Sequence, residues 1–82
     1  MKLGIVTGAV WATKKSPALT GQILLRVDVQ GAEYIAADRV GAGCGDRVIL
    51  AFGAAARLGQ AETPVDAAIV GILDETEGLR HG

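Results

Sequence analysis

Five short apolar segments, separated by glycine, proline and polar residues, recur along this chain of 82 residues. They lie at residues 2–13, 23–29, 33–40, 46–52 and 67–73. Short runs of this kind that contain valine and isoleucine are typical of β-strands, because β-branched side chains pack well on a pleated surface. Only Gln30, Gly31 and Ala32 separate the second segment from the third, which predicts a tight hairpin.

The first segment carries Gly4 and Gly8, and the two-residue period of a strand places both on one face, together with Val6, Val10 and Ala12. Small residues there leave room for another backbone or a sharp bend, which is typical of a small closed barrel. Residues 53–59 hold three alanines and Arg57 between glycines, which fits one or two turns of helix. The sequence therefore predicts an all-β fold, a small five-stranded OB-like barrel with a short helical turn.

The length allows one domain, residues 1–82, of which residues 75–82 are a polar C-terminal tail. The aliphatic residues are mostly small, with 14 Ala and 8 Val beside 8 Leu and 6 Ile, and Phe, Trp, Tyr and Met occur once each. Such a core buries few methylene groups, so we expect burial between subunits to supply part of the stability.

The net charge of −1, from 8 basic and 9 acidic residues, argues against a nucleic-acid partner, since phosphate contacts need clustered positive charge. No apolar run approaches the roughly 20 residues of a membrane-spanning helix, and the start of the chain does not resemble a signal peptide. We therefore expect a cytoplasmic protein with no membrane partner.

Catalytic and metal-binding residue types are scarce. The only cysteine is Cys44, the only histidine is His81 and the only serine is Ser16, so no zinc cluster and no recognisable Ser-His-Asp triad can be assembled. Asp66 and Asp74 bracket the last segment and could share acid–base work, but nothing else completes a site, which favours turn or interface roles. We expect no catalytic residues, no cofactor and no metal.

A glycine-rich loop follows the third segment and consists of Gly41, Ala42, Gly43, Cys44 and Gly45. A dinucleotide-binding loop would have a third glycine where Asp46 stands and would continue into a helix, whereas a strand is expected here. The remaining interpretations are a tight connection that needs positive φ and the lining of an oligomer axis. Cys44 is either a small residue tolerated in the turn or an exposed thiol.

Arg57 and Trp11 each have two interpretations. Arg57 is either a solvated charge at the end of a helical turn or one half of an ion pair with Asp38, Asp66 or Asp74 of a neighbouring subunit. Trp11 is expected on the odd-numbered face with Ile5, Thr7 and Ala9, as a partly buried barrel or interface residue. A nucleic-acid platform would need several aromatic and basic residues.

Three stretches together resemble the bacterial microcompartment vertex proteins of the EutN/CcmL family. They are GIVTGAVWATKK at residues 4–15, DRVGAGCGD at residues 38–46 and PVDAAIVGILD at residues 64–74. Their order matches that of the family and they span nearly the whole chain. Two features depart from the family pattern: GAAAR at residues 53–57 stands where Gly-Ser-Ser-Ala-Arg is usual, and the connection at residues 30–32 is short.

The resemblance implies a pentameric, non-enzymatic shell subunit that caps the five-fold vertices of a microcompartment, with hexameric shell proteins as partners. Glycine and alanine suit a five-fold axis, where five copies converge, so the axis is expected at Gly41–Gly45 or at Gly53, Ala54 and Ala55. The expected intersubunit residues are Arg57, Asp38, Asp66, Asp74 and Trp11. The alternative is an OB-type module that binds nucleic acid or a small ligand.

Overall fold

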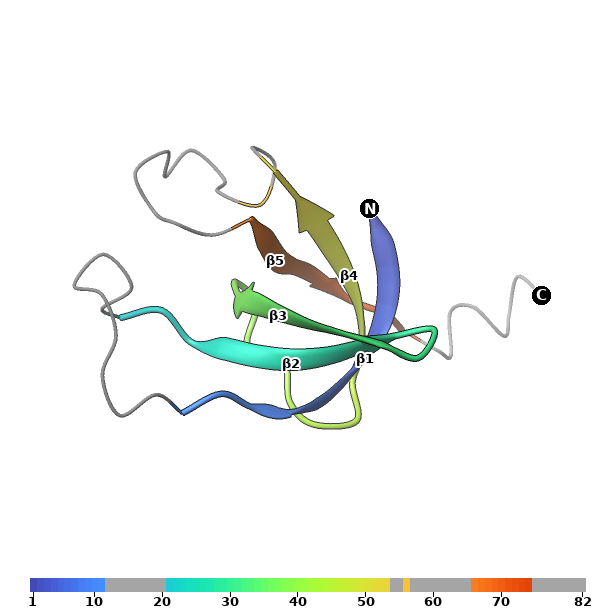
Figure 1. The fold of residues 1–82 in the computed structure, drawn as a ribbon, viewed down its shortest axis with the longest axis horizontal. Coiled ribbons are helices and arrows are strands. Elements are labelled where there is room, and N and C mark those ends of the chain that lie inside the picture. Colours follow the sequence, from blue (N-terminus) through green and yellow to red (C-terminus); the bar gives the residue numbers. More distant parts are fainter. Residues whose placement is uncertain (12–20, 54–55, 57–65, 75–82) are drawn as a thin grey trace.

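The computed structural model describes residues 1–11, 21–53, 56 and 66–74, and it contains five strands (Figure 1). The strands are β1 (Lys2–Ala9), β2 (Leu24–Val29), β3 (Ala32–Asp38), β4 (Arg47–Phe52) and β5 (Ala67–Ile72). They form a closed barrel in the order β1-β2-β3-β5-β4. All neighbouring pairs are antiparallel except β3 and β5, which run parallel. The predicted five-stranded all-β barrel is confirmed.

The connection between β2 and β3 is a two-residue turn at Gln30 and Gly31, with φ angles of +52° and +88°. Positive φ at both central residues matches the right-handed twist of the flanking strands, and it explains why Val29 pairs directly with Ala32. The predicted tight hairpin is confirmed. Of the predicted helical turn at residues 53–59, only Gly53 and Ala56 are among the described residues. The N–H of Ala56 donates to the Gly53 carbonyl at 3.1 Å.

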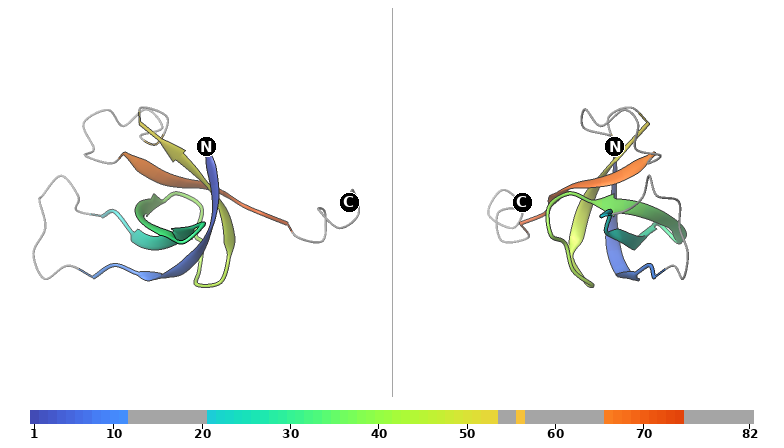
Figure 2. Two further views of the ribbon diagram at one scale, coloured as in Figure 1. Left: turned by 45° about the vertical axis from the view of Figure 1, so that its right-hand side comes forward. Right: turned by 90° about the vertical axis from the view of Figure 1, so that its left-hand side faces the viewer.

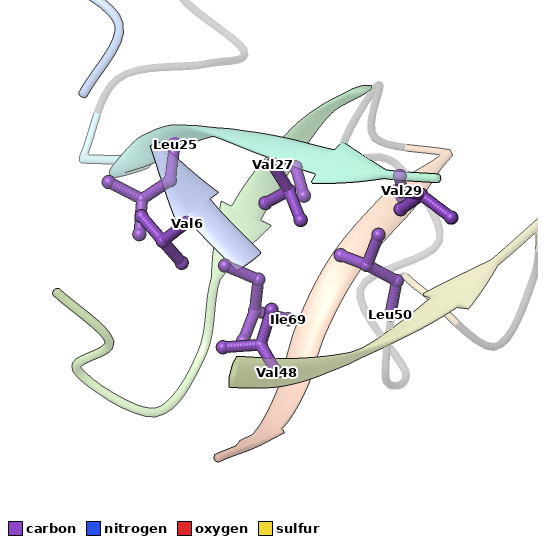
Figure 3. Close-up of a cluster of buried hydrophobic side chains, with 9 residues drawn as sticks. Val6, Leu25, Val27, Val29, Val48, Leu50 and Ile69 are labelled. Carbon is purple, nitrogen blue, oxygen red and sulfur yellow. The ribbon is translucent and has the colours of Figure 1, made fainter. Parts of the chain in front are cut away.

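The core is built from inward-facing aliphatic residues of all five strands (Figure 3). Its fully buried members include Val6 from β1, Val27 from β2, Ile69 from β5, and Val48 and Leu50 from β4. Three alanines, Ala37, Ala56 and Ala68, form a second small cluster. Because alanine and valine dominate both clusters, each strand gains little burial from any one neighbour, and closure of the barrel is what covers the core.

One extra residue in β1, Thr7, interrupts the alternation of its side chains. Val6 pairs with Val27 of β2, but the next paired residue is Gly8, opposite Arg26, so Thr7 forms a β-bulge. Its hydroxyl donates to the Arg26 carbonyl at 3.3 Å. Because one extra residue exchanges the two faces of the strand, the expectation that Gly8 shares the face of Gly4 is wrong.

Gly4 is the position in β1 where small size is required. A Cβ atom at Gly4 would lie 2.6 Å from Cγ1 of Val27 and 2.7 Å from the carbonyl oxygen of Asp28. The expected close approach of another backbone is therefore confirmed at Gly4. At Gly8 nothing lies within 4 Å of such an atom, and the expected irregularity takes the form of the neighbouring bulge.

Candidate assembly surfaces

The glycine-rich loop joins β3 to β4 and is held by the carboxylate of Asp38. Oδ1 of Asp38 accepts hydrogen bonds from the backbone N–H groups of Val40 and Gly41 at 3.0 Å and of Ala42 at 3.2 Å. Gly41 and Gly45 adopt φ angles of +80° and +92°, which only glycine reaches without strain. The expected tight connection with positive φ is confirmed.

The same loop is not built to cradle a phosphate. The N–H of Gly43 donates to Oδ2 of Asp46 at 2.8 Å, so the N–H groups of residues 40–43 already have carboxylate acceptors within the chain. A bound anion would have to displace these carboxylates and would be repelled by their charge. The loop therefore serves as a rigid strand connection rather than as a nucleotide site.

The loop also fastens the middle of β1. The N–H of Val6 donates to the Asp46 carbonyl at 3.0 Å, and the N–H of Gly45 donates to the Val6 carbonyl at 2.8 Å. The exposed thiol of Cys44 lies 3.5 Å from the carbonyl oxygen of Thr7, to which it donates. Of the two interpretations of Cys44, the exposed thiol is confirmed, and the thiol stands directly beside the bulge.

The two segments proposed for a five-fold axis lie at opposite ends of β4 (Figures 1 and 2). The glycine-rich loop precedes Arg47, whereas Gly53 follows Phe52 and has a φ angle of +63°. Six residues of strand separate the two ends by about 20 Å, so a single narrow ring can be lined by only one of them. Ala54 and Ala55 lie outside the described residues.

The three candidate carboxylates occupy different parts of the surface. Asp38 is engaged in its own loop, and Asp74 follows β5 at the end where the N–H of Leu73 donates to the Arg47 carbonyl. Asp66 is exposed, and its carbonyl accepts the Gly53 N–H at 2.9 Å. Asp66 is therefore the carboxylate that the fold places beside the segment leading to Arg57, which itself lies outside the described residues.

The same arrangement removes the acid–base pairing of Asp66 and Asp74. The two residues stand at opposite ends of β5, about 25 Å of extended chain apart, so their carboxylates cannot share a proton or a substrate atom. Within the described residues no group of three histidine, cysteine, aspartate or glutamate side chains could hold a metal ion. Nor does this part of the chain contain a helix long and apolar enough to span a membrane.

Trp11 lies beyond the end of β1 and is 91% exposed in the single chain. The interpretation of Trp11 as a partly buried barrel residue is therefore wrong, and the interface interpretation remains a prediction. The expectation that it shares a face with Ile5 is also wrong, because the bulge at Thr7 lies between them.

Two residues that sequence reasoning did not single out lie close to this end of the barrel. Ile23, a large aliphatic residue directly before β2, is 62% exposed. Arg39 is half-buried, and its guanidinium nitrogen atoms Nε and Nη2 have no hydrogen-bond partner within the described part of the chain. The one signal in the sequence was the charge of Arg39 between apolar strand residues and a glycine-rich loop, which does not by itself reveal burial.

The described residues form a small closed β-barrel with several large apolar side chains exposed on the single chain. The sequence matches the family model described as ethanolamine utilisation protein EutN/carboxysome over residues 1–74. The chain belongs to this EutN/CcmL family, as the resemblance of its three stretches predicted.

The relatives of the chain are named as shell vertex proteins. The microcompartment shell vertex protein PduN of Salmonella typhimurium is 41% identical in an alignment that covers 90% of this chain and 96% of PduN. The carboxysome shell vertex protein CcmL of Synechocystis is 43% identical in an alignment that covers 90% of this chain and 83% of CcmL.

Solved structures show the same fold. The pentameric microcompartment shell protein GrpN from Rhodospirillum rubrum superposes with a TM-score of 0.80 at 41% identity, covering 90% of this chain and 94% of GrpN. A pentameric shell protein of the RMM microcompartment superposes with a TM-score of 0.83 at 34% identity, covering 93% of each chain. The fold is therefore that of pentameric shell proteins.

Proposed function

We propose that this chain forms a homopentamer that caps the five-fold vertices of a bacterial microcompartment shell inside the cell. The observation that carries the proposal is the family match over residues 1–74, together with the likeness to pentameric shell proteins over nine-tenths of the chain. A flat sheet of hexagonal units cannot close into a polyhedron without five-fold units at its corners. The pentamer sits among hexameric shell proteins and completes the barrier, and the chain has no catalytic activity of its own.

The physical character of the barrel supports assembly. Its core consists of small aliphatic residues, and large apolar side chains remain exposed on the single chain. Burial of such side chains between copies would add the apolar area that a small domain lacks. The alternative, an OB-type module for nucleic acid, is not favoured: Tyr34 and Phe52 pack edge-to-face at 5.5 Å against the core and offer no stacking platform.

The proposal is tested by deleting this chain from cells that express the other shell proteins. The expected result, seen by electron microscopy, is elongated or open shells, with leakage of the enclosed reaction intermediates and normal amounts of the other shell proteins. Restoring the chain should restore closed shells. Closed, regular shells in its absence, with no second vertex protein present, would contradict the proposal.

We propose that one of the two segments at the ends of β4 lines the five-fold axis, and Cys44 reports which one. Five copies of the exposed Cys44 thiol would converge if the glycine-rich loop lined the axis. Mild oxidation should then cross-link neighbouring chains within one pentamer, visible as dimers on a non-reducing gel, and Cys44→Ser is the matched control. Absence of cross-links would place Cys44 away from the axis and would leave the vertex role intact.

We further propose that Arg57 forms an intersubunit ion pair with Asp38, Asp66 or Asp74 of a neighbouring copy. Arg57→Ala should weaken the pentamer in a dilution series and leave the unfolding of the barrel unchanged. The matched control is Arg26→Ala, which removes the exposed pair with Glu33 (Nε–Oε1 2.7 Å) and should change neither property by more than a little. Equal pentamer stability in wild type and Arg57→Ala would count against the ion pair.

A further inference from the structure

The outer wall of the barrel carries an open hollow of about 140 Å³ on the first half of β1. Its apolar part is formed by Leu3 and Ile5, which are 53% and 45% exposed although both are large aliphatic residues. The lining consists of Leu3, Gly4 and Ile5 from β1, Asp28 from β2, Arg47 from β4, and Gln30. Covering this surface would remove apolar area from water, so the hollow favours an aliphatic side chain from another segment.

A cation and an anion stand on opposite sides of Ile5 in this hollow. Ile5 pairs with Arg47 of β4 on one edge and with Asp28 of β2 on the other. Directly paired residues point to the same face of a sheet, so the three side chains form one row on the outer wall. Adjacent strands lie about 4.8 Å apart, which places the backbones of Arg47 and Asp28 about 10 Å from each other. The hollow therefore presents the order cation, aliphatic, anion to any segment that crosses it.

The chain leaves β5 at the end of the same row. The N–H of Leu73 donates to the Arg47 carbonyl at 2.8 Å, and β5 lies on the side of β4 away from β1. The tail that follows, residues 75–82, has the sequence ETEGLRHG and lies beyond the part of the chain that the family model matches. Leu79 stands six positions after Leu73, a reach of about 20 Å in an extended chain, whereas Ile5 is only two strand spacings, about 10 Å, from Leu73. The tail is therefore long enough to return to the hollow.

The charges of the tail have the order opposite to that of the hollow. Glu77, Leu79 and Arg80 give the order anion, aliphatic, cation. An extended chain rises about 3.3 Å per residue, so Glu77 and Arg80 lie about 10 Å apart, the same separation as that of Arg47 and Asp28. Spacing and charge therefore match when the tail crosses the hollow from β4 towards β2.

We propose that the tail folds back over the outer wall of its own barrel and that Leu79 fills the hollow. Glu77 then faces Arg47, and Arg80 faces Asp28. The guanidinium of Arg47 has five N–H donors, so it can take this carboxylate in addition to its contacts within the barrel. The charge order fixes the direction, because a reversed tail would place like charges together. The inference goes beyond the proposed function, since the docked tail covers this face of a single chain whether or not five copies assemble.

Disulfide trapping tests the docking in the full chain, with Cys44→Ser removing the native thiol. Leu79→Cys is combined either with Leu3→Cys in the hollow or with Ile72→Cys, a control at an exposed position at the end of β5. A tail without a docking site would close the control pair faster, because that position is nearer to the start of the tail. We expect the opposite order: the pair in the hollow should close at least about tenfold faster, because docking raises the local concentration of the two thiols. Intact mass spectrometry identifies the product as a single chain that has lost two hydrogen atoms.

Two results of this experiment would overturn the inference. Faster closure of the control pair would show that the tail does not dock in the hollow. Disulfides between two chains, in place of the single-chain product, would show that the tail does not belong to the hollow of its own barrel. Neither result bears on the vertex role, which the deletion experiment tests separately.

A charge exchange in the same chain with Leu3→Cys and Leu79→Cys tests the direction of the tail. Glu77→Arg alone and Arg47→Glu alone should each slow closure roughly two- to fivefold, the range expected for an exposed ion pair. The two together should restore the rate, because opposite charges then face each other again. Glu75→Arg is the matched control, with the same change of charge two positions earlier, and should slow closure less. Equal slowing by Glu75→Arg and Glu77→Arg, or no restoration in the double variant, would overturn the pairing of Glu77 with Arg47.

Discussion

The two halves of β1 differ in what covers them. In the first half, Gly4 is buried, and a single added carbon would collide with Val27 and with the backbone of Asp28. In the second half, Gly8 has nothing within 4 Å of the same position, and the chain continues to the exposed Trp11. Thr7 separates the two halves. Gly4 and Gly8 therefore have unrelated roles although both belong to β1. The bulge at Thr7 places Gly8 on the other face of the strand, where it has different neighbours.

The two halves also differ in their pairing. The first half of β1 pairs with β4 over residues 2–5, and the pairing with β2 begins at Ile5 and continues through the second half. Only the first half contains a residue, Gly4, at which an added carbon atom has no room. Substitutions by larger residues should therefore destabilise the chain more in the first half than in the second.

The largest effect is expected at Gly4. Gly4→Ala should lower the free energy of unfolding by about 3 kcal/mol, because the Asp28 carbonyl oxygen that the new methyl group meets belongs to the backbone and cannot turn aside. Urea unfolding of the isolated chain, followed by circular dichroism, measures the change. A wild-type midpoint would mean that β1 can move away from β2 at no cost, and the contrast between the two halves would disappear.

An intermediate effect is expected at Asp38, which holds the loop that fastens Val6 just before the bulge. Asp38→Ala removes the acceptor of three backbone N–H groups, and water can replace it only in part, so the free energy of unfolding should fall by about 2 kcal/mol. Asp38→Asn keeps an acceptor oxygen and should lose about half as much. Amide hydrogen exchange should speed up at Gly41 and Val6 in Asp38→Ala and not at Val27; uniform acceleration would contradict a local role.

The smallest effect is expected at Gly8, the matched control for Gly4. Gly8→Ala meets open space and an ordinary φ, so the free energy of unfolding should change by less than about 0.5 kcal/mol, or rise slightly because alanine has less freedom in the unfolded chain. The same urea titration measures it. A loss as large as that of Gly4→Ala would show that the second half of β1 is packed within the chain after all.

Most of the fold follows from local features of the chain. The strands start and end within a few residues of the predicted segments, and the hairpin at Gln30 and Gly31 and the glycines at positive φ were expected from their turn chemistry. The bulge was not expected, since Thr7 is an ordinary strand residue and only the register against β2 shows that it is extra. The expected strand face of Trp11 was wrong for the same reason.

The sequence likewise predicts some features of the candidate surfaces and not others. The order of the three family stretches and the small residues at Gly41–Gly45 are readable along the chain, because each depends on residues close in sequence. That Arg39 is half-buried beside Gln22, that Ile23 stays exposed and that Asp66 stands next to Gly53 depend on contacts between distant segments. Strand propensity and turn geometry act over a few residues, whereas pairing partners, burial and uncompensated charge exist only once the barrel has closed.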